Sequence, residues 1–523
     1  MTMTGRPRWL TLERTLSCIV MLAVLIYAVS FLDPYIALII TPLFALGCAR
    51  GKHPLTLLAL ASIPALVLIA VSSVKLFLTG LPLVTYDHYF LRQNVLLLAY
   101  NDWRVATGLV IGIVGLLFYI RGLFAGRGSF TRFEKGSLVA FSVACLLCVR
   151  SAQGFADKVF DWSEQLNTPT IQAFVMSSQI PGPELHTLYP ANATPPAIGA
   201  GLKPPTGHLP DIFFVLQEST FPPNVVRPGY EPRWLFARTA PHSGPLHVHT
   251  FAGGTWKTEF SVVTQMRPQE FGSDGLYVFH QLAGRINHSI FTLLKTLGYR
   301  TMVFYPVPGT FLNARSFYGS IGVDEFYDPE ALGLGKGWEW NIPDSAFYQA
   351  MVKKVADSDR PVVAFMLTIN QHGPHNNDDP ISDYVTRFEA SDAAYGAFLD
   401  TLSRRGRKAG VVTFGDHQPE FMARFQDNHA RWYFTAYDMR CVNFECIRTS
   451  LTDRGARPVD SVMLASMALE GFGFTLDTFS DLQRTVFKGC DDDITRCDET
   501  ARLTYNTAFA KYFNQDDATR LAN

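Results

Sequence analysis

The apolar residues of this chain are concentrated in its first 150 residues, where they form five separate runs. A tilted transmembrane helix needs about 17–25 mostly apolar residues. The first and third runs have that length, and the other three need their flanking residues to cross a bilayer. The runs are approximately Leu16–Leu32, Tyr35–Ala49, Leu55–Val74, Val105–Ile120 and Gly136–Val149. The sequence therefore predicts an α-helical membrane domain of about five spans over residues 1–150.

The first run has a second interpretation, as a secretory signal peptide. Four more apolar runs follow it, and no small-residue cleavage site stands out, which favours a membrane span. Four or six spans are the main alternatives to five.

The positive charges of the loops predict how these spans are oriented, because Lys and Arg accumulate on the cytoplasmic side. With the N-terminus inside, nine positive residues fall on inner segments and four on outer segments. The inner set is Arg6, Arg8, Arg14, Arg50, Lys52, Arg121, Arg127, Arg132 and Lys135, and the outer set is Lys75, Arg92, Arg104 and Arg150. An odd number of spans then places the chain after residue 150 outside the cytoplasm.

The cysteines outside the apolar runs form two close pairs, Cys441 with Cys446 and Cys490 with Cys497. Local pairs in an exported domain are typical of disulfides, whereas metal binding favours a C-x-x-C spacing with histidines nearby. We therefore expect two disulfide bonds, in agreement with the predicted orientation.

Residues 151–210 connect the apolar region to the rest of the chain. Apolar side chains recur at helical spacing between Phe155 and Leu166, which predicts a juxtamembrane amphipathic helix. The stretch from Pro181 to Pro210 contains eight prolines and is expected to be an extended linker.

From residue 211 to 523 the pattern changes to that of an α/β domain. Apolar runs typical of buried parallel strands occur at Asp211–Gln217, Thr301–Tyr305, Pro361–Ile369 and Gly410–Phe414. Helical patterns lie between them, for example at Ser289–Leu297 and Tyr384–Leu402. This alternation predicts a mainly parallel sheet covered by helices on both faces. The formal net charge of -1 and the absence of a basic run give no indication of a nucleic-acid partner.

Polar residues follow the predicted strands, where open α/β sheets hold their active sites. Glu218-Ser219-Thr220 follows the first strand, Gln371-His372-Gly373-Pro374-His375 the third, and Asp416-His417-Gln418 the fourth. Between the first two strands, Gly253-Gly254-Thr255 is typical of a glycine turn that opens a helix. Carboxylate and imidazole groups on neighbouring strand ends bind divalent metals, and a hydroxyl at a helix N-terminus lies where phosphate oxygens bind. Each feature alone is more often structural, but four of them in this register indicate one site.

These motifs resemble those of lipoteichoic acid synthases and related membrane phosphoglycerol transferases, in the alkaline phosphatase and sulfatase superfamily. They are Glu-Ser-Thr after the first strand, Gly-x-Thr-x-x-x-Glu-Phe at Gly253–Phe260, Asn-x-His-x-Pro at Asn370–Pro374, and Gly-Asp-His at Gly415–His417. The resemblance extends to the architecture, with five spans, a linker helix and a domain from residue 211 onwards. It implies a multi-pass protein of the bacterial inner (plasma) membrane with a periplasmic or extracellular catalytic domain.

The resemblance also implies the roles of individual residues. The metal ligands would be Glu218, Thr255, Asp416 and His417, around a divalent ion that is usually Mn²⁺, with Zn²⁺ and Mg²⁺ as alternatives. Thr255 would be the nucleophile, with Arg315 holding the phosphate of the lipid and His372 near the phosphoryl oxygens. The donor would be phosphatidylglycerol or phosphatidylethanolamine, and the acceptor an envelope glycan, polymer or lipid. Thr258 has no place in the motif, so we expect its loss to cost little.

Several readings stay open beside a phosphoglycerol transferase. The family usually has a histidine shortly before the arginine, but Tyr305–Thr310 contains none. This departure leaves the glycerophosphate head group open. A phosphoethanolamine transferase is the second interpretation, because the nucleophile motif of that family usually lacks the Glu-Phe pair. A membrane-anchored phosphoester hydrolase and a catalytically silent binding protein are the further alternatives. Formylglycine sulfatases are excluded, because no cysteine here lies in a C-x-P-x-R sequence. Lys257 and His375 are expected either to contribute to the site or to lie at the surface.

The loop charges generate a test of topology. A periplasmic phosphatase reporter fused after Pro210 should be active, whereas a reporter that needs the cytoplasm should be silent at the same position. The opposite pattern would contradict both the predicted orientation and the reason for expecting disulfides.

Overall fold

The computed structural model describes residues 63–65, 67–69, 71–72, 83–87, 173–174 and 201–489, the last with gaps at 238–241, 338–339, 426–428 and 449–456. The chain divides into two units, Met1–Ile180 and Pro181–Asn523. Within the described ranges, no helix combines the length and the apolar character that a membrane crossing requires. The five predicted spans and the 151–210 linker fall almost entirely outside these ranges and stay predictions.

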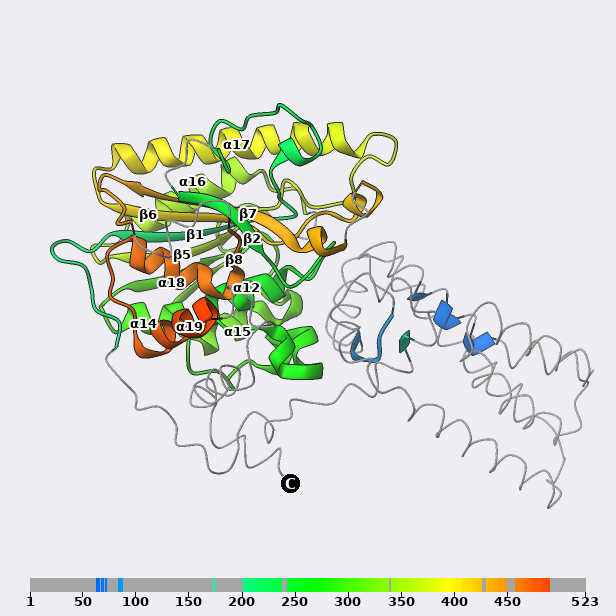
Figure 1. Cartoon of the computed structure of the whole chain (residues 1–523), viewed down its shortest axis with the longest axis horizontal. Coiled ribbons are helices and arrows are strands. Elements are labelled where there is room, and N and C mark those ends of the chain that lie inside the picture. The colour runs from blue at the N-terminus through cyan, green and yellow to red at the C-terminus, as the bar shows by residue number, and fades with distance from the viewer. Residues whose placement is uncertain are drawn as a thin grey trace, which may run out of the picture. The chain divides into compact units, whose positions relative to one another are not determined.

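The second unit is built on one eight-stranded sheet with the order β4-β3-β5-β1-β6-β7-β2-β8 (Figure 1). All strands run parallel except β7, which is antiparallel to both of its neighbours. The strands are β1 Asp211–Gln217, β2 His242–His247, β3 Arg300–Phe304, β4 Glu325–Tyr327, β5 Val362–Leu367, β6 Ala409–Gly415, β7 Phe434–Val442 and β8 Val459–Asp460. The predicted mainly parallel sheet is confirmed.

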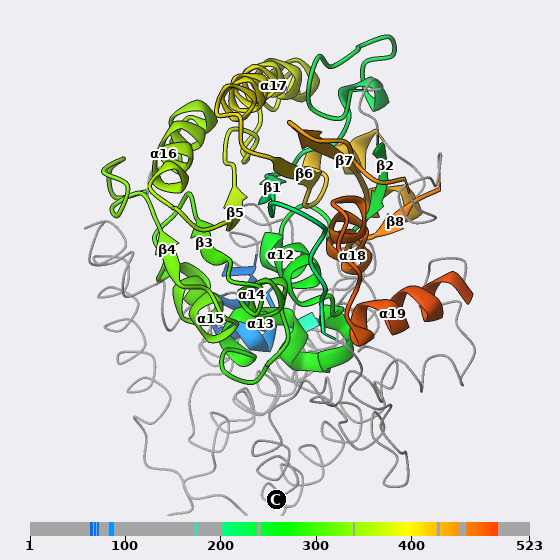
Figure 2. The same ribbon diagram turned by 90° about the vertical axis from the view of Figure 1, so that its left-hand side faces the viewer.

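Helices cover both faces of the sheet (Figure 2). One layer holds α16 (Asp344–Ala356) and α17 (Pro380–Arg404). The opposite layer holds α12 Thr255–Thr264, α13 Val278–Gln281, α14 Ile290–Lys295, α15 Ala314–Ser320, α18 Ser461–Gly471 and α19 Thr478–Gly489. The 3-10 helices are η1 Thr85–Asp87, η3 Pro223–Val225, η4 Pro268–Tyr277, η5 Phe311–Asn313, η6 Glu420–Arg424 and η7 His429–Tyr433.

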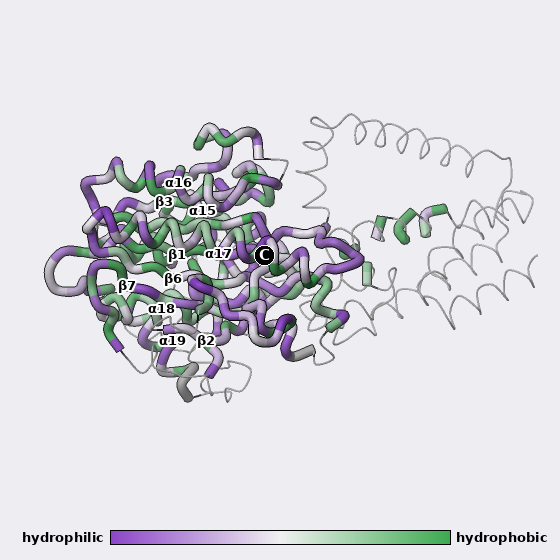
Figure 3. The backbone as a smooth tube through the Cα atoms, turned by 90° about the horizontal axis from the view of Figure 1, so that it is seen from above, coloured by the Kyte–Doolittle hydropathy of each residue, from purple (hydrophilic) through white to green (hydrophobic). Residues whose placement is uncertain are grey.

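The continuous apolar run of β1 follows from its position at the middle of this sandwich. All seven residues of the strand are buried, because each face of the strand meets a helical layer. Ile212 and Phe214 join the core beneath α12 and α18, while Phe213 points the other way and packs edge-on against Phe398 of α17. In Figure 3 the hydrophobic colour concentrates on these inner strands, and the outlying loops are mostly hydrophilic.

The elements predicted from the sequence are found with small shifts at their ends. The predicted strands correspond to β1, β3, β5 and β6, and the two predicted helices to α14 and α17. The sequence did not indicate β2, β4, β7 and β8. The six residues of β2, His-Ser-Gly-Pro-Leu-His, lack an apolar run because only two of them are fully buried. β8 has only two residues and forms by pairing with β2.

The predicted Cys441–Cys446 disulfide is present, at the end of β7, with the two Cα atoms 5.4 Å apart. The second predicted pair, Cys490 with Cys497, lies outside the described residues. The structure therefore confirms the first of the two predicted disulfides, and the second stays a prediction.

We expect both links in protein purified from the membrane without reductant. Peptide mass spectrometry of unreduced digests should show Cys441 joined to Cys446 and Cys490 joined to Cys497. Alkylation of Cys490 and Cys497 as free thiols would contradict the second link and weaken the case for an oxidising compartment.

Candidate metal centre and active site

The pairing of β1 with β6 brings the first two carboxylates together. Gln217 pairs with Gly415 at the end of the parallel ladder, so Glu218 and Asp416 are the next residues on adjacent strands. Gly415 is required here because a Cβ atom at this position would lie 1.8 Å from the carbonyl oxygen of Thr220. This close passage of the chain after β1 explains the glycine of the Gly-Asp-His motif.

The turn after β1 uses Ser219 to connect the two carboxylates. Ser219 lies in the left-handed region with φ 49°, a conformation that costs free energy in a residue other than glycine. Its backbone N–H donates to Asp416 Oδ1 at 2.7 Å, and its hydroxyl donates to Glu218 Oε1 at 2.8 Å. The strained turn thus satisfies one oxygen of each carboxylate and leaves the others directed at the site.

Thr255 reaches the same place from the first turn of α12. Gly254, the residue before the helix, has φ 79°, and a Cβ atom there would lie 2.8 Å from Thr250 Oγ1. The predicted glycine turn that opens a helix is therefore confirmed. Thr255 Oγ1 donates to Glu218 Oε2 at 3.1 Å and lies 3.4 Å from His417 Nε2.

His417 is held so that one ring nitrogen faces the cluster. Its Nδ1 lies 3.0 Å from the carbonyl oxygen of Gln418, which can only accept a hydrogen bond, so Nδ1 carries the proton. The other nitrogen, Nε2, then presents its lone pair 3.2 Å from Asp416 Oδ2 and 3.7 Å from Glu218 Oε1. Burial lowers the pKa of His417, which favours this neutral form. A carbonyl that fixes the tautomer in this way is typical of histidines that bind metals.

The charges of the cluster fit a divalent cation. Glu218, Asp416 and His417 are all buried, and one potential ligand atom from each lies within 4.8 Å of the others. Asp416 Oδ2 is buried without a hydrogen bond. Burial raises the pKa of Asp416 to about 7, and burial together with the nearby Asp416 raises the pKa of Glu218. Two buried carboxylates with an unsatisfied oxygen are costly unless a cation compensates them, so these residues fit the predicted metal.

Thr258 supports the cluster, contrary to the expectation that its loss would cost little. Its side chain is fully buried, and its hydroxyl donates to the backbone carbonyl of Asp416 at 2.7 Å. The motif did not indicate this role, because the bond is to a backbone atom 158 residues away. Thr258 is therefore a positioning residue for Asp416.

Glu259 lies beneath the cluster in a buried network. Tyr318 donates to its Oε2 at 2.5 Å, and Tyr305 donates to its Oε1 at 3.4 Å. Burial raises the pKa of Glu259 to about 8. Tyr305 is also the first residue of Tyr305–Thr310, the stretch that lacks the expected histidine. Its side chain packs in the core.

In the part of the chain that the structure describes, Arg315 and His372 hydrogen-bond to groups other than the cluster. Arg315, in α15, pairs with Asp328 Oδ2 at 2.5 Å and stacks over Phe326 at 4.8 Å. Half of its side chain is exposed, so the guanidinium also faces solvent. His372 follows β5, and its ring lies 4.4 Å from that of Trp340. The charge of His372 contributes to lowering the pKa of both Glu218 and His417.

Lys257 and His375, the two undecided residues, are not ordinary surface groups. Lys257 is 5% exposed in α12. His375 packs its ring against Phe421 at 5.0 Å, and its Nε2 is buried without a hydrogen bond. Burial lowers the pKa of His375 to about 4, so it is neutral at physiological pH.

Comparisons with known proteins agree with this geometry. Residues 210–440 match the protein-family model described as Sulfatase. A protein of Bacillus subtilis described as lipoteichoic acid synthase-like YvgJ is 26% identical over 189 residues, which cover 33% of this chain and 30% of that protein. An uncharacterized protein of Haemophilus influenzae is 27% identical over 244 residues, which cover 40% of this chain and 44% of that protein. The predicted resemblance is confirmed.

Among solved structures, the domain is similar to the phosphoglycerol transferase GacH of Streptococcus pyogenes in complex with sn-glycerol-1-phosphate. The TM-score is 0.46 with 15% identity, over 58% of this chain and 86% of that chain. This chain spans less than half the length of the two curated relatives described above.

The raised pKa of Asp416 generates a prediction for metal binding. Below about pH 7 an ion has to displace the proton of this carboxyl, so affinity should fall by up to about tenfold per pH unit. In the metal-free protein the folded pKa lies above the unfolded value. Asp416 therefore contributes stability that is lost as the pH rises through about 7. Because the ion binds more tightly when this carboxyl is ionised, the stabilisation by Mn²⁺ should be larger at about pH 8 than at about pH 6.

The measurement is the rise in Tm on adding Mn²⁺ after treatment with a chelator, at the two pH values. Asp416→Asn, which removes one of the titrating carboxyls, should reduce the rise at both pH values and weaken its pH dependence. An equal rise at both pH values in the unmodified protein would contradict the prediction.

Proposed function

Because residues 210–440 form a sulfatase-family domain, we propose that this chain is a metal-dependent phosphotransferase. It moves a phospholipid head group, phosphoglycerol in the first place, to an envelope glycan, polymer or lipid through a covalent intermediate on Thr255. The observation that carries this proposal is the position of the Thr255 hydroxyl. It lies at the start of α12, within 3.1 Å of Glu218 Oε2 and 3.4 Å of His417 Nε2.

The ligand set of the proposed ion is Glu218, Thr255, Asp416 and His417, and the ion is Mn²⁺ in the first place. A divalent ion bound there would lower the pKa of the Thr255 hydroxyl and neutralise charge on the phosphoryl oxygens. The backbone N–H groups of the first turn of α12 add a favourable field for a phosphate at the same point.

The reaction proceeds in two displacements at phosphorus. Thr255 Oγ1 forms a bond to the phosphorus of the phospholipid while the bond to the diacylglycerol oxygen breaks, and diacylglycerol leaves with the proton that Thr255 gave up. An acceptor hydroxyl then attacks the same phosphorus, the bond to Thr255 breaks, and the threonine regains a proton. Each step exchanges one phosphoester for another, so no oxidant or further energy source is needed.

Arg315 and His372 are proposed to bind the donor. The guanidinium of Arg315 is anchored on one side by Asp328, and its exposed side remains for the lipid phosphate. His372 contributes to the electrostatic environment of Glu218, which supports the proposal that its ring contacts a phosphoryl oxygen of the donor.

The second candidate for the transferred head group is phosphoethanolamine. The stretch from Tyr305 to Thr310 lacks the histidine that would contact glycerol, and Tyr305 is directed into the core toward Glu259. The predicted topology puts either donor within reach, because the domain would face the outer leaflet of the inner membrane.

We expect Thr255→Ala to reduce head-group transfer by roughly a thousandfold or more, because it removes the proposed nucleophile. Thr255→Ser should keep measurable activity, since it keeps the hydroxyl. Thr264→Val is the matched control at the other end of the same helix, where the hydroxyl bonds only to the carbonyl of Phe260. Thr258→Val should fall between them, with a loss of about 10- to 100-fold through the position of Asp416.

The measurement uses the full chain in liposomes with Mn²⁺ and labelled phosphatidylglycerol or phosphatidylethanolamine. A trapped adduct on Thr255 identifies the donor by whether its mass matches glycerophosphate or phosphoethanolamine. Label released as free head-group phosphate, with none on any acceptor, would favour a hydrolase. Full activity of Thr255→Ala would refute the threonine mechanism, and inactivity toward both lipids would favour a binding protein.

A further inference from the structure

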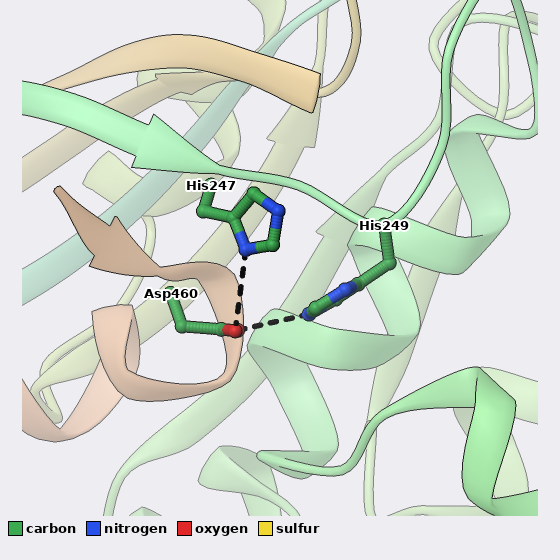
Figure 4. A group of neighbouring side chains, drawn as sticks. All are labelled: His247, His249 and Asp460. Carbon is green, nitrogen blue, oxygen red and sulfur yellow. Dashed lines mark hydrogen bonds and ion pairs between the residues drawn. The ribbon is translucent and has the colours of Figure 1, made fainter. Parts of the chain in front are cut away.

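A second group of metal-binding side chains lies at the same edge of the sheet, outside the centre described above. His247 is the last residue of β2, His249 lies on the loop that leads toward α12, and Asp460 ends β8 (Figure 4). The two histidines alternate with Val248, so the chain directs both imidazoles toward Asp460 from one side. One potential ligand atom from each residue lies within 4.8 Å of the others.

The two histidines lie at different distances from Asp460. His249 Nε2 lies 2.9 Å from Asp460 Oδ1, which is an ordinary hydrogen-bond distance. His247 Nδ1 lies 3.6 Å from Asp460 Oδ2, too far for a hydrogen bond. Asp460 and His249 are buried, with side chains 1% and 3% exposed, while the side chain of His247 is 32% exposed.

These separations are close to those in a tetrahedral zinc site. With bonds of about 2.0–2.1 Å, two ligands of one Zn²⁺ lie about 3.3–3.4 Å apart. The 3.6 Å and 2.9 Å contacts lie on either side of this value, so a small adjustment of the side chains would accommodate an ion. Two imidazoles and one carboxylate are a donor set for Zn²⁺, with a fourth position left for water on the exposed side of His247.

We propose that His247, His249 and Asp460 bind a divalent transition metal ion, Zn²⁺ in the first place, as a second metal centre. It is separate from the Glu218 centre, because β2 and β6 are separated by β7 and neighbouring strands lie about 4.8 Å apart. The spacing of about 10 Å exceeds the 3.5–4 Å of a two-metal catalytic site.

The alternative is a purely structural Asp–His contact. Asp460 does have such a role, since its Oδ1 accepts from the backbone N–H of Val462 and caps α18. That role and the His249 contact together use only Oδ1. The second imidazole faces Oδ2 at 3.6 Å, beyond hydrogen-bond distance, and a cation bound between the two groups would give each of them a direct partner.

A metal at this position would stabilise the segment that carries Thr255. The backbone N–H of Val248 donates to Tyr433, and that of Ala252 donates to Gln418, whose carbonyl also orients His417. The second centre would therefore fasten β2 to β8 and fix the loop between them and α12. This proposal concerns metal binding alone and stands or falls independently of the proposed transfer reaction.

The test is the zinc content of the full-length protein in detergent, measured by inductively coupled plasma mass spectrometry after removal of loose metal. Glu218→Gln/Asp416→Asn, which replaces both carboxylates of the first centre by isosteric amides, should still hold about one equivalent of Zn²⁺. Adding His247→Ala to this background should remove it. Because His247 is partly exposed, this change should leave the fold intact.

His208→Ala is the matched control, since His208 is an exposed histidine of the same unit. It should leave the zinc content unchanged. In the unmodified background, His247→Ala should lower the zinc content by about one equivalent and the rise in Tm on adding Zn²⁺ should shrink. Absence of zinc in the Glu218→Gln/Asp416→Asn protein, or equal zinc content with and without His247→Ala, would overturn the proposal. An unmodified protein that binds this zinc but transfers neither lipid head group would refute only the proposed function.

Discussion

The parallel pairing of β1 with β6 is the interaction on which the candidate site depends. The ladder runs without interruption from Asp211 with Ala409 to Gln217 with Gly415, and every residue of both strands is buried. A shift of one residue would turn the side chains of either strand to the other face, so the apolar core fixes the register. The same register then puts Glu218 beside Asp416 at the end of the ladder.

Two carboxylates held side by side in a buried position are electrostatically unfavourable. The domain reduces this cost with local donors: the N–H groups of Ser219 and His417 both bond to Asp416 Oδ1. The remaining oxygen, Oδ2, accepts no hydrogen bond from the described residues. Burial raises the pKa of both carboxylates, because the charged forms have too few compensating partners. The buried negative charge of the two carboxylates therefore favours the binding of a cation at this edge of the sheet. The Thr255 hydroxyl lies within hydrogen-bond distance of Glu218.

Much of this arrangement was predictable from the sequence because it follows from local patterns. The apolar run of β1, the glycine turn before Thr255 and the polar residues after each strand are all readable without a structure. The support of Thr258 was not, since its partner is a backbone carbonyl 158 residues away. The pairing of Arg315 with Asp328, and the meeting of His247 with Asp460, likewise depend on tertiary contacts. Strand β2 escaped prediction because its residues are only partly buried.

The group of His247, His249 and Asp460 lies at the same carboxyl edge of the sheet as the Glu218 centre. Strand β7 is antiparallel to both β6 and β2, so β2 and β8 run in the same direction as β1 and β6. All four strands therefore end at the same edge of the sheet. One atom connects the two regions mechanically: the carbonyl oxygen of Gln418 accepts both His417 Nδ1 and the N–H of Ala252. Movement of the loop after β2 would therefore act on a proposed ligand and on the start of α12 together. A metal that fixed this loop would therefore also help to hold Thr255 Oγ1 and His417 Nε2 at their separation of 3.4 Å.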